Sequence, residues 1–188
     1  MWPGFLYGCM FLMNRFVAMI KLRLALSLSF AIVAMAAGAQ TEKQYHTDQV
    51  MVSGLVRTPI TFSIADLDTF PHHQTDSLKI TNHRGEIKNT LYNVIGVKLT
   101  DLLHQCVIDD KPRNMGGYYI VCTAEDGYVT VYSWNELFNS ATGEGVWIVL
   151  SVNGSKILDD GVILINASDT FNGRRHVKWL RSVEVRKA

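Results

Sequence analysis

The feature that most constrains the fold is a succession of short segments with β-strand composition, which begins near residue 50 and continues to the C-terminus. The clearest of these segments are 50–56, 60–62, 78–82, 118–122, 128–132, 146–152, 161–165 and 179–185, with a further extended piece near 89–92. Runs of this length that are rich in Val, Ile, Thr and Tyr and bounded by turn residues predict strands. Two of the intervening turns, Glu125-Asp126-Gly127 and Asn153-Gly154, have the composition of tight hairpin turns.

Three short helices are expected between these strands. Ser63 stands three residues before Asp66, which is the spacing of a capping box, and the helix should run on to Phe70 because Pro71 follows. A second helix is expected to begin at Thr100, and a third follows the capping box formed by Ser133 and Glu136. Many short strands with a few short helices predict an α+β domain, mainly β, with a mixed sheet.

The first 39 residues differ from the rest because they contain no Asp or Glu. Lys21 and Arg23 precede the uncharged run 24–37, and the small residues Ala37-Gly38-Ala39 follow it. A basic start, an apolar core and a small-residue cleavage site predict a signal peptide, with Met19 as an alternative start. An uncleaved anchor is the other interpretation, although the run is shorter than the roughly 20 residues that span a bilayer. Cleavage would leave a flexible N-terminus at 40–48 and a domain at 49–188.

Charge and cysteine content exclude several functions. Without the three basic residues of the first 39, 15 basic side chains stand against 17 acidic ones, and no basic block remains. Nucleic acid is therefore not an expected partner. Cys106 and Cys122 have neither Cys-x-x-Cys nor zinc spacing, so no metal site is predicted. They could form a disulfide or be two buried thiols, and the latter interpretation is favoured.

The residues that could bind a ligand are concentrated late in the chain, between Asp169 and Trp179. No Gly-x-Ser-x-Gly motif and no phosphate-binding glycine loop occurs, so no catalytic residue is assigned. Arg174, Arg175 and Lys178 lie beside a glycine and two aromatic residues. Arginine binds phosphate or carboxylate through two parallel hydrogen bonds, and an aromatic ring can stack on a planar ligand. The segment is thus either an anion site or a solvated surface loop.

Several motifs in the same order resemble the oxidoreductase molybdopterin-binding domain of the sulfite oxidase type. They are Val52–Val56 with Pro59, Phe62–Leu67, Gly96–Leu103, Ala124–Tyr128 with Glu136-Leu137, Val146–Leu150 and Gly173–Leu180. Enzymes of this family hold molybdenum through a cysteine just after the strand that corresponds to 78–82. This chain has Ile80, Thr81, Asn82 and His83 there, and none of these side chains supplies a thiolate. The resemblance therefore implies the fold without the molybdenum chemistry.

The type of signal peptide agrees with this expectation. Proteins that carry a preassembled molybdenum cofactor are exported folded through a twin-arginine signal. The sequence Lys21-Leu22-Arg23 has no Arg-Arg pair and is typical of the general secretory route, which exports unfolded chains. No tightly bound cofactor is expected, and the ligand that the resemblance implies is a pterin or a molybdopterin.

The resemblance implies a periplasmic or secreted binding protein with a pterin-type pocket, because some cysteine-free relatives serve as ligand sensors for membrane signalling partners. The ligand would be small, planar and polar. The expected ligand-binding residues are Asn82, His83, Arg84, Asp126, Tyr128, Arg174, Arg175, His176 and Lys178, and Trp179 could also stack. Two alternatives stay open: a molybdenum-dependent oxidoreductase with an atypical ligand set, and an interaction domain whose pocket is vestigial.

Overall fold

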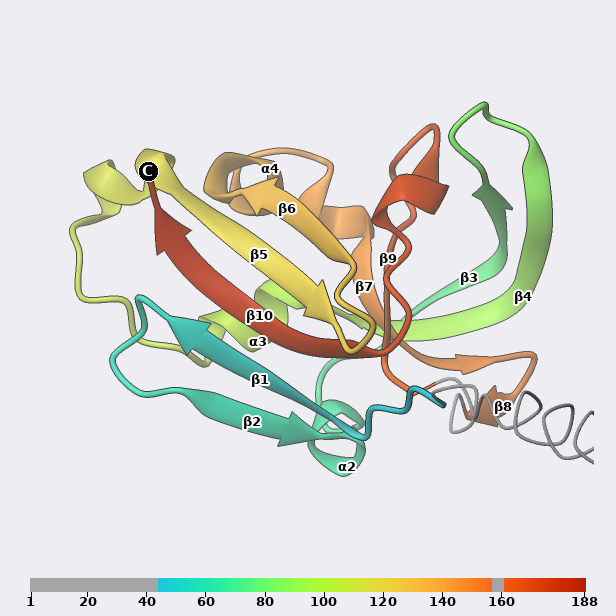
Figure 1. Cartoon of the computed structure of the whole chain (residues 1–188), viewed down its shortest axis with the longest axis horizontal. Helices are drawn as coiled ribbons and strands as arrows, with labels where there is room; N and C mark the ends of the chain where they lie inside the picture. Colours follow the sequence, from blue (N-terminus) through green and yellow to red (C-terminus); the bar gives the residue numbers. More distant parts are fainter. Residues whose placement is uncertain (1–43, 157–160) are drawn as a thin grey trace, which may run out of the picture. The chain divides into compact units, whose positions relative to one another are not determined.

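Two five-stranded sheets form the fold in the computed structural model, which describes residues 44–156 and 161–188 (Figure 1). The first sheet has the order β2 (Ile60–Ser63), β1 (Gln49–Gly54), β10 (Leu180–Lys187), β5 (Tyr118–Ala124) and β6 (Val129–Ser133). The second contains β3 (His73–Thr81), β4 (Ile87–Lys98), β7 (Val146–Val152) and β8 (Ser155–Lys156), and β9 (Ile163–Asn166) also pairs with β7. The pairing of β1 with β10 is parallel and the other pairings are antiparallel.

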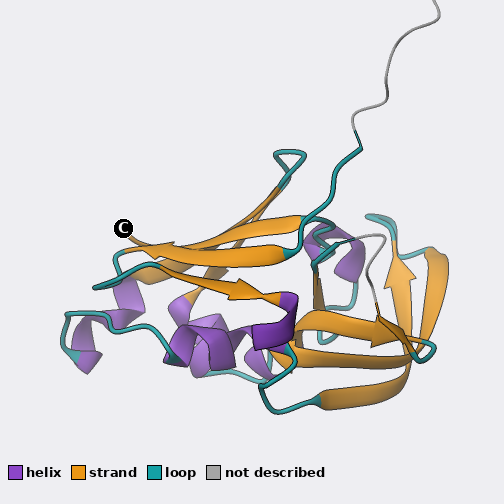
Figure 2. Ribbon diagram, turned by 90° about the horizontal axis from the view of Figure 1, so that it is seen from below, coloured by secondary structure: helices purple, strands orange, loops and turns teal. Residues whose placement is uncertain are grey.

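Six helical segments lie in four of the connections between strands in the described part of the chain. They are the α-helices α2 (Ile64–Leu67), α3 (Leu99–His104) and α4 (Trp134–Phe138), and the 3-10 helices η1 (Pro112–Gly117), η2 (Gly143–Gly145) and η3 (Asn172–Arg175). In Figure 2 the strands of the first sheet cross the upper part of the view, and most of the helical turns lie below them. One face of this sheet is therefore covered and the other is open.

The main hydrophobic core lies on the covered face of the first sheet. Alternate residues of β1 point into it, so that Val50 and Val52 are fully buried while Met51 is 43% exposed. Leu102 of α3 and Leu164 of β9 pack against the same cluster. A second, smaller cluster includes Ile165, the neighbour of Leu164, together with residues of β3, β4 and β7. Because successive side chains of a strand point to opposite faces, β9 contributes to both clusters.

The two predicted capping boxes are present, whereas the predicted start of the middle helix is wrong. The side chains of Ser63 and Ser133 accept hydrogen bonds from the backbone N–H groups of Asp66 and Glu136. The side chains of Asp66 and Glu136 accept in turn from the backbone N–H groups of the two serines. α2 nevertheless ends at Leu67 and not at Phe70. α3 begins at Leu99 after Lys98, and Thr100 is a buried residue inside the helix. Packing of α3 into the core, and not a side-chain cap, decides where this helix begins.

The hairpin formed by β3 and β4 is much longer than the sequence predicts. The expected strands at 78–82 and 89–92 are parts of a nine-residue and a twelve-residue strand, which pair from His73 with Gly96 to Thr81 with Ile87. His73, which no predicted strand included, therefore starts β3. Pairing supplies the backbone hydrogen bonds here, so polar residues without a β-type pattern become strand residues.

The described end of the segment that was expected to be flexible is docked on the domain. The rings of Tyr45 and Trp179 lie 5.2 Å apart, and Thr47 is only 6% exposed. The backbone N–H of Val162 donates to both the carbonyl oxygen and the hydroxyl of Thr47, at 3.2 and 3.0 Å. The expected signal peptide, 1–39, lies outside the described residues. No helix of the described part is long and apolar enough to cross a membrane.

Candidate functional site

η3 is held against the end of β3 by Asn172, which is 3% exposed. The Oδ1 of Asn172 accepts a hydrogen bond from the backbone N–H of Thr81 at 3.0 Å, and its Nδ2 donates to the carbonyl oxygen of Lys79 at 2.7 Å. A β-carbon at Gly173 would lie 1.8 Å from the carbonyl oxygen of Thr81. Only glycine permits this approach, so Asn172 and Gly173 together place η3 beside the β3–β4 turn.

The β3–β4 turn is shaped by Asn82, one of the expected ligand-binding residues. Its Oδ1 accepts hydrogen bonds from the backbone N–H groups of Arg84 and Glu86, and its Nδ2 donates to the Glu86 carboxylate at 2.7 Å. The side chains of His83 and Arg84 are exposed at the tip of this turn. Asn82 is therefore occupied as a turn residue, while its two neighbours present donors to solvent.

The β5–β6 turn joins the same region through Tyr128. Its hydroxyl donates to the carbonyl oxygen of Arg174 at 2.6 Å, and its backbone N–H donates to Oδ1 of Asp126 at 2.9 Å. The backbone N–H of Glu125 donates to the carbonyl oxygen of Trp179 at 2.8 Å. One carboxylate oxygen of Asp126 is therefore used within the turn. The β3–β4 turn, the β5–β6 turn and η3, which are far apart in the sequence, lie together here.

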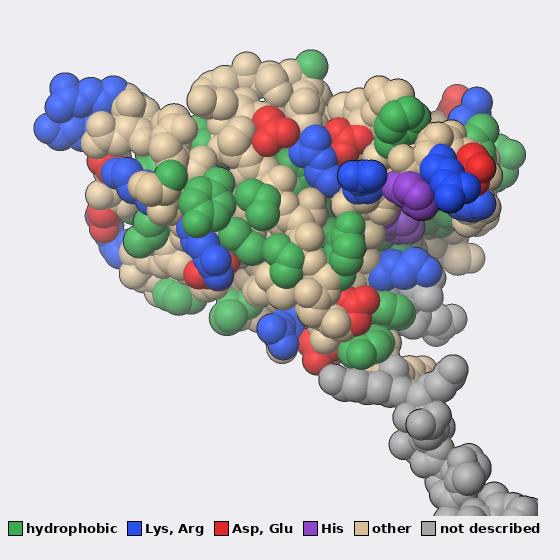
Figure 3. Space-filling model, turned by 45° about the horizontal axis from the view of Figure 1, so that its top comes forward, with side chains coloured by type: hydrophobic (Ala, Val, Ile, Leu, Met, Phe, Trp, Pro, Cys, Tyr) green, Lys and Arg blue, Asp and Glu red, His purple; other side chains and the backbone are tan. Residues whose placement is uncertain are grey.

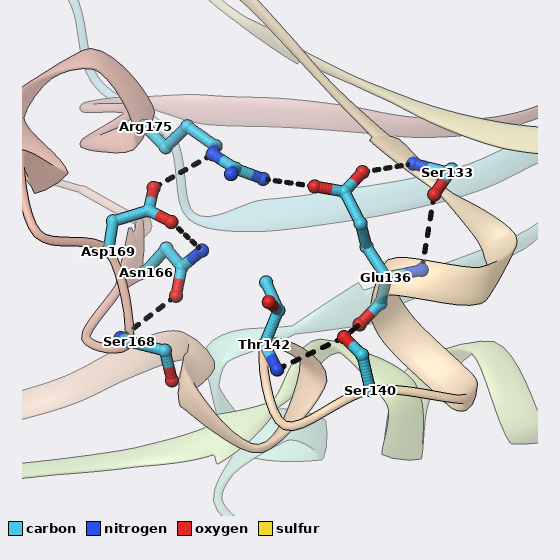
Figure 4. Close-up of polar contacts among 8 residues, drawn as sticks. All are labelled: Ser133, Glu136, Ser140, Thr142, Asn166, Ser168, Asp169 and Arg175. Carbon is cyan, nitrogen blue, oxygen red and sulfur yellow. Dashed lines mark hydrogen bonds and ion pairs between the residues drawn. The ribbon is translucent and has the colours of Figure 1, made fainter.

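Arg175 forms ion pairs with two carboxylates, and its side chain is only 25% exposed (Figure 4). Its Nε lies 2.8 Å from Oδ2 of Asp169, and its Nη1 lies 3.2 Å from Oε1 of Glu136. The guanidinium carbon lies 4.8 Å from the centre of the Tyr132 ring. Arg175 therefore connects η3 with α4, with β6 and with the loop after β9.

The two carboxylates of this centre have pKa values shifted in opposite directions. Burial raises the pKa of Asp169, and the charge and hydrogen bond of Arg175 offset this only in part. Burial also acts to raise the pKa of Glu136, but hydrogen bonds from Ser133 and Arg175 outweigh it and lower the value. Asp169 is held in turn by the side-chain amide of Asn166 at 2.9 Å.

The remaining expected residues follow η3 along the chain. His176 is half-buried, Val177 is buried and bridges to Leu164, and Lys178 is exposed. Trp179 has a φ of +54°, which is unusual for a bulky residue and turns the chain into β10. In Figure 3, basic and histidine side chains gather at the end of the domain where the β3–β4 hairpin projects. The exposed donors among the expected residues are those of His83, Arg84, Arg174 and Lys178.

Sequence analysis does not assign several residues that organise this region. Glu136 has a sequence signal, the capping box, but that motif indicates only a helix start. Asp169 lies in the polar segment and Asn172 in the glycine-containing turn, without a motif that indicates their contacts. Tyr132 belongs to a predicted strand, and its hydroxyl is buried without a hydrogen-bond partner among the described residues. Nothing in the sequence pattern distinguishes it from a core tyrosine.

Neither described cysteine belongs to the segment at the end of β3. Cys106 follows α3, and Cys122 is fully buried in β5; both are free thiols. Burial raises the pKa of Cys106 and raises that of Cys122 to about 12. A high thiol pKa disfavours the thiolate form that ligates metals. At the end of β3 itself, Ile80 is buried in the second cluster and Asn82 is used in the turn.

Comparison with known proteins identifies the fold. A protein-family model described as "Oxidoreductase molybdopterin binding domain" matches residues 37–188. Among solved structures, the sulfane dehydrogenase SoxCD from Paracoccus pantotrophus is similar, with a TM-score of 0.54 and 18% identity. The match covers 78% of this chain and 39% of that chain, so this chain spans well under half of the relative. A search of curated proteins found no match. The predicted mainly β, mixed-sheet fold is confirmed, and the chain belongs to the oxidoreductase molybdopterin-binding domain family.

Proposed function

We propose that the chain is a periplasmic binding protein that holds a pterin-type ligand at η3 and works as a sensor without molybdenum redox chemistry. Family membership supports the pterin-type ligand. The convergence of the β3–β4 turn, the β5–β6 turn and η3 supports the location, because it joins residues 82–84, 126–128 and 174–178. The signalling partner would be a membrane protein that responds to the occupied domain.

The observation that carries the non-catalytic proposal is the set of donors at the end of β3. Molybdenum in this family needs a soft thiolate, whereas the described side chains there are Ile80, Thr81, Asn82 and His83. The two described thiols belong to other elements, one buried in β5 and one after α3. These donors do not fit a thiolate-held metal. Secretion of an unfolded chain, as expected from residues 19–39, would also separate the protein from cofactor loading in the cytoplasm.

The organic part of the ligand would contact the exposed donors around η3. Arg174 and Lys178 supply charges for an anionic or carbonyl group, and His83 and Arg84 supply further donors from the β3–β4 turn. Asp126 is exposed and could accept from the amino and ring N–H groups of a pterin. Tyr128 is 43% exposed and offers part of its ring for stacking.

The proposed ligand can be tested on protein purified from the periplasm of its native host. We expect a copurifying pterin, detected by fluorescence and mass spectrometry after denaturation, without stoichiometric molybdenum. Stoichiometric molybdenum together with turnover of an oxo-transfer substrate would establish the enzyme alternative instead. Protein that contains neither and does not bind added pterin would support the interaction domain with a vestigial pocket.

The assignment of the site predicts the effect of removing single charges. Arg174→Ala and Lys178→Ala should each weaken pterin binding by about 10- to 100-fold, because a hydrogen bond to a charged group contributes about 1.5–3 kcal/mol. Arg57→Ala is the matched control, since Arg57 is an exposed arginine paired with Asp109 at another place. Unchanged affinity in both site variants, measured by fluorescence titration, would show that the ligand binds elsewhere.

A further inference from the structure

An open groove of about 590 Å³ lies between η1 and α4, and it shares no lining residue with the pterin site proposed above. Small-molecule sites in proteins have volumes of about 300–1,000 Å³ and combine an apolar wall with a few placed polar groups. Here the apolar wall comes from Ile108, Pro112 and Met115. Trp134 adds an aromatic ring, which is held in place by stacking on Phe138 at 4.0 Å between ring centres.

Of the two charged residues that line the groove, only Arg113 has no partner among the described residues and can bind a ligand. The carboxylate of Asp110 accepts hydrogen bonds from Lys187 at 2.8 Å, from the Tyr118 hydroxyl at 2.9 Å and from the Asn114 amide at 2.5 Å. Asp110 is therefore neutralised and has few acceptor positions left. Arg113, the other charged lining residue, is exposed and has no ion pair with any residue in 44–156 or 161–188. A ligand entering the groove would meet a net charge close to +1.

The side-chain amides that line the groove are oriented by a hydrogen bond between them. The Nδ2 of Asn139 donates to Oδ1 of Asn135 at 2.7 Å, and this fixes the Asn135 amide. The Nδ2 of Asn135 can then donate to a ligand, since no described residue accepts from it. It lies 3.7 Å from the position that a β-carbon at Gly116 would occupy.

Gly116 and Gly117 have no structural need to be glycine. Neither has a positive φ, and a β-carbon at Gly117 would have nothing within 4 Å. A β-carbon at Gly116 would meet only Asn135, at the ordinary contact distance given above, and it would project into the groove. Glycine at position 116 therefore leaves the backbone open to close approach by a ligand.

We propose that this groove is a second binding site, for a small monoanionic carboxylate with a flat or apolar body. The carboxylate pairs with the guanidinium group of Arg113, where two parallel hydrogen bonds match its geometry. The body of the ligand packs against Trp134 and Met115, and the amide of Asn135 donates to a polar group of the ligand. The proposal is independent of the pterin function, because the two sites share no residue.

Benzoate is the probe that tests this proposal, with benzamide as its uncharged counterpart. NMR titration should show the indole N–H signal of Trp134 shifting with benzoate, with a Kd on the order of 1 mM, which is typical for so small a ligand. Benzamide should bind at least tenfold more weakly. Arg113→Ala and Gly116→Ala should each weaken benzoate binding at least tenfold, whereas Gly117→Ala should leave it unchanged.

Gly116→Ala is the decisive variant because the fold has room for the added methyl group. Its midpoint of thermal unfolding should equal that of Gly117→Ala. Equal midpoints would show that weaker benzoate binding results from the methyl group in the groove and not from a loss of stability. The proposal is wrong if benzoate causes no Trp134 shift at ten times the expected Kd, or if Gly116→Ala binds as the wild type does. Equal affinities for benzoate and benzamide would equally exclude recognition of a carboxylate.

Discussion

The guanidinium group of Arg175 connects η3 with α4, which lies 39 positions earlier in the chain. It pairs with Asp169 from the loop after β9 and with Glu136 from α4, and it covers the ring of Tyr132 (Figure 4). Asp169 is only 17% exposed. Removing the arginine would leave this carboxylate in a partly buried position without a counter-charge, which costs more than the loss of an exposed pair.

Arg175→Ala should therefore lower the free energy of unfolding by about 1–3 kcal/mol, less than for a fully buried pair because one quarter of the arginine is exposed. Arg175→Lys should give an intermediate loss, because lysine keeps the charge but cannot bind both carboxylates as a planar fork. Arg57→Ala removes a pair exposed by about 60% on each side and should cost less than about 0.5 kcal/mol. Urea unfolding measures all three, and equal losses for Arg175→Ala and Arg57→Ala would contradict the bridging role.

At the scale of the element, α4 depends on its first turn. The Ser133 hydroxyl accepts from the backbone N–H of Glu136, and the Glu136 carboxylate accepts from the backbone N–H of Ser133. The same carboxylate binds Arg175, so the capping box of the helix is also its connection to η3. Trp134 and Asn135 of this helix line the groove on the side of η1, which places α4 between the two proposed sites.

The capping box predicts a specific pH dependence. The pKa of Glu136 is lowered from 4.5, so the stability that it contributes is present above pH 4.5 and is lost as the pH falls through the lower folded-state value. Glu136→Gln should be less stable than wild type at pH 7, and this difference should shrink toward pH 3. Asp169, whose pKa is raised, titrates in the opposite sense and stabilises the fold more when protonated. Urea midpoints between pH 3 and pH 7 measure the effect, and a difference that does not change with pH would refute it.

A second prediction for α4 concerns the cap alone. Ser133→Ala removes the side chain that satisfies the N–H of Glu136 and should destabilise the protein by about 1 kcal/mol. Ser63→Ala, in the corresponding box of α2, is the matched comparison because Asp66, the acidic residue of that box, forms no ion pair with another described residue. A larger loss of pterin affinity in Ser133→Ala than in Ser63→Ala would be expected from the position of α4 beside η3.

At the scale of the whole molecule, β9 connects the two hydrophobic clusters. Leu164 and Ile165 are adjacent and fully buried, and they belong to the first and the second cluster respectively. Leu164→Ala and Ile165→Ala should each cost about 2–5 kcal/mol because both leave cavities. Since one strand carries both side chains, circular dichroism and tryptophan fluorescence should report one coincident transition in each variant. Separate transitions for Ile165→Ala would show that the β3–β4 hairpin unfolds independently.

Local pattern accounts for most elements that sequence analysis predicts correctly. β5 and β6 follow from β-type runs around Glu125-Asp126-Gly127, and α4 follows from its capping box, because these signals depend on residues close together in the chain. The start of α3 and the full length of β3 and β4 do not follow in this way. Long-range packing and strand pairing determine them, and neither is visible in a short window.

In the candidate site, too, some features follow from the local sequence and others only from long-range contacts. The sequence suggests ligand-binding residues in three separate segments, and the structure places these segments together. It also shows that Asn82 is occupied in a turn and Arg175 in ion pairs, whereas Arg174 and Lys178 are exposed. Residue type indicates which groups can bind an anion, but only the contacts of each side chain show which groups are available.

The amino-acid sequence by itself determined the family, the mainly β composition and the absence of a sulfur donor at 80–83, because these are properties of residue order and chemistry. The tertiary structure alone decided that Asn172 and Gly173 join η3 to β3, and that an open groove lined by Arg113 and Trp134 lies between η1 and α4. Such contacts join residues tens of positions apart, 91 in the case of Thr81 and Asn172. They form when packing of the core brings the elements together, so the secondary-structure preferences of short sequence segments do not predict them.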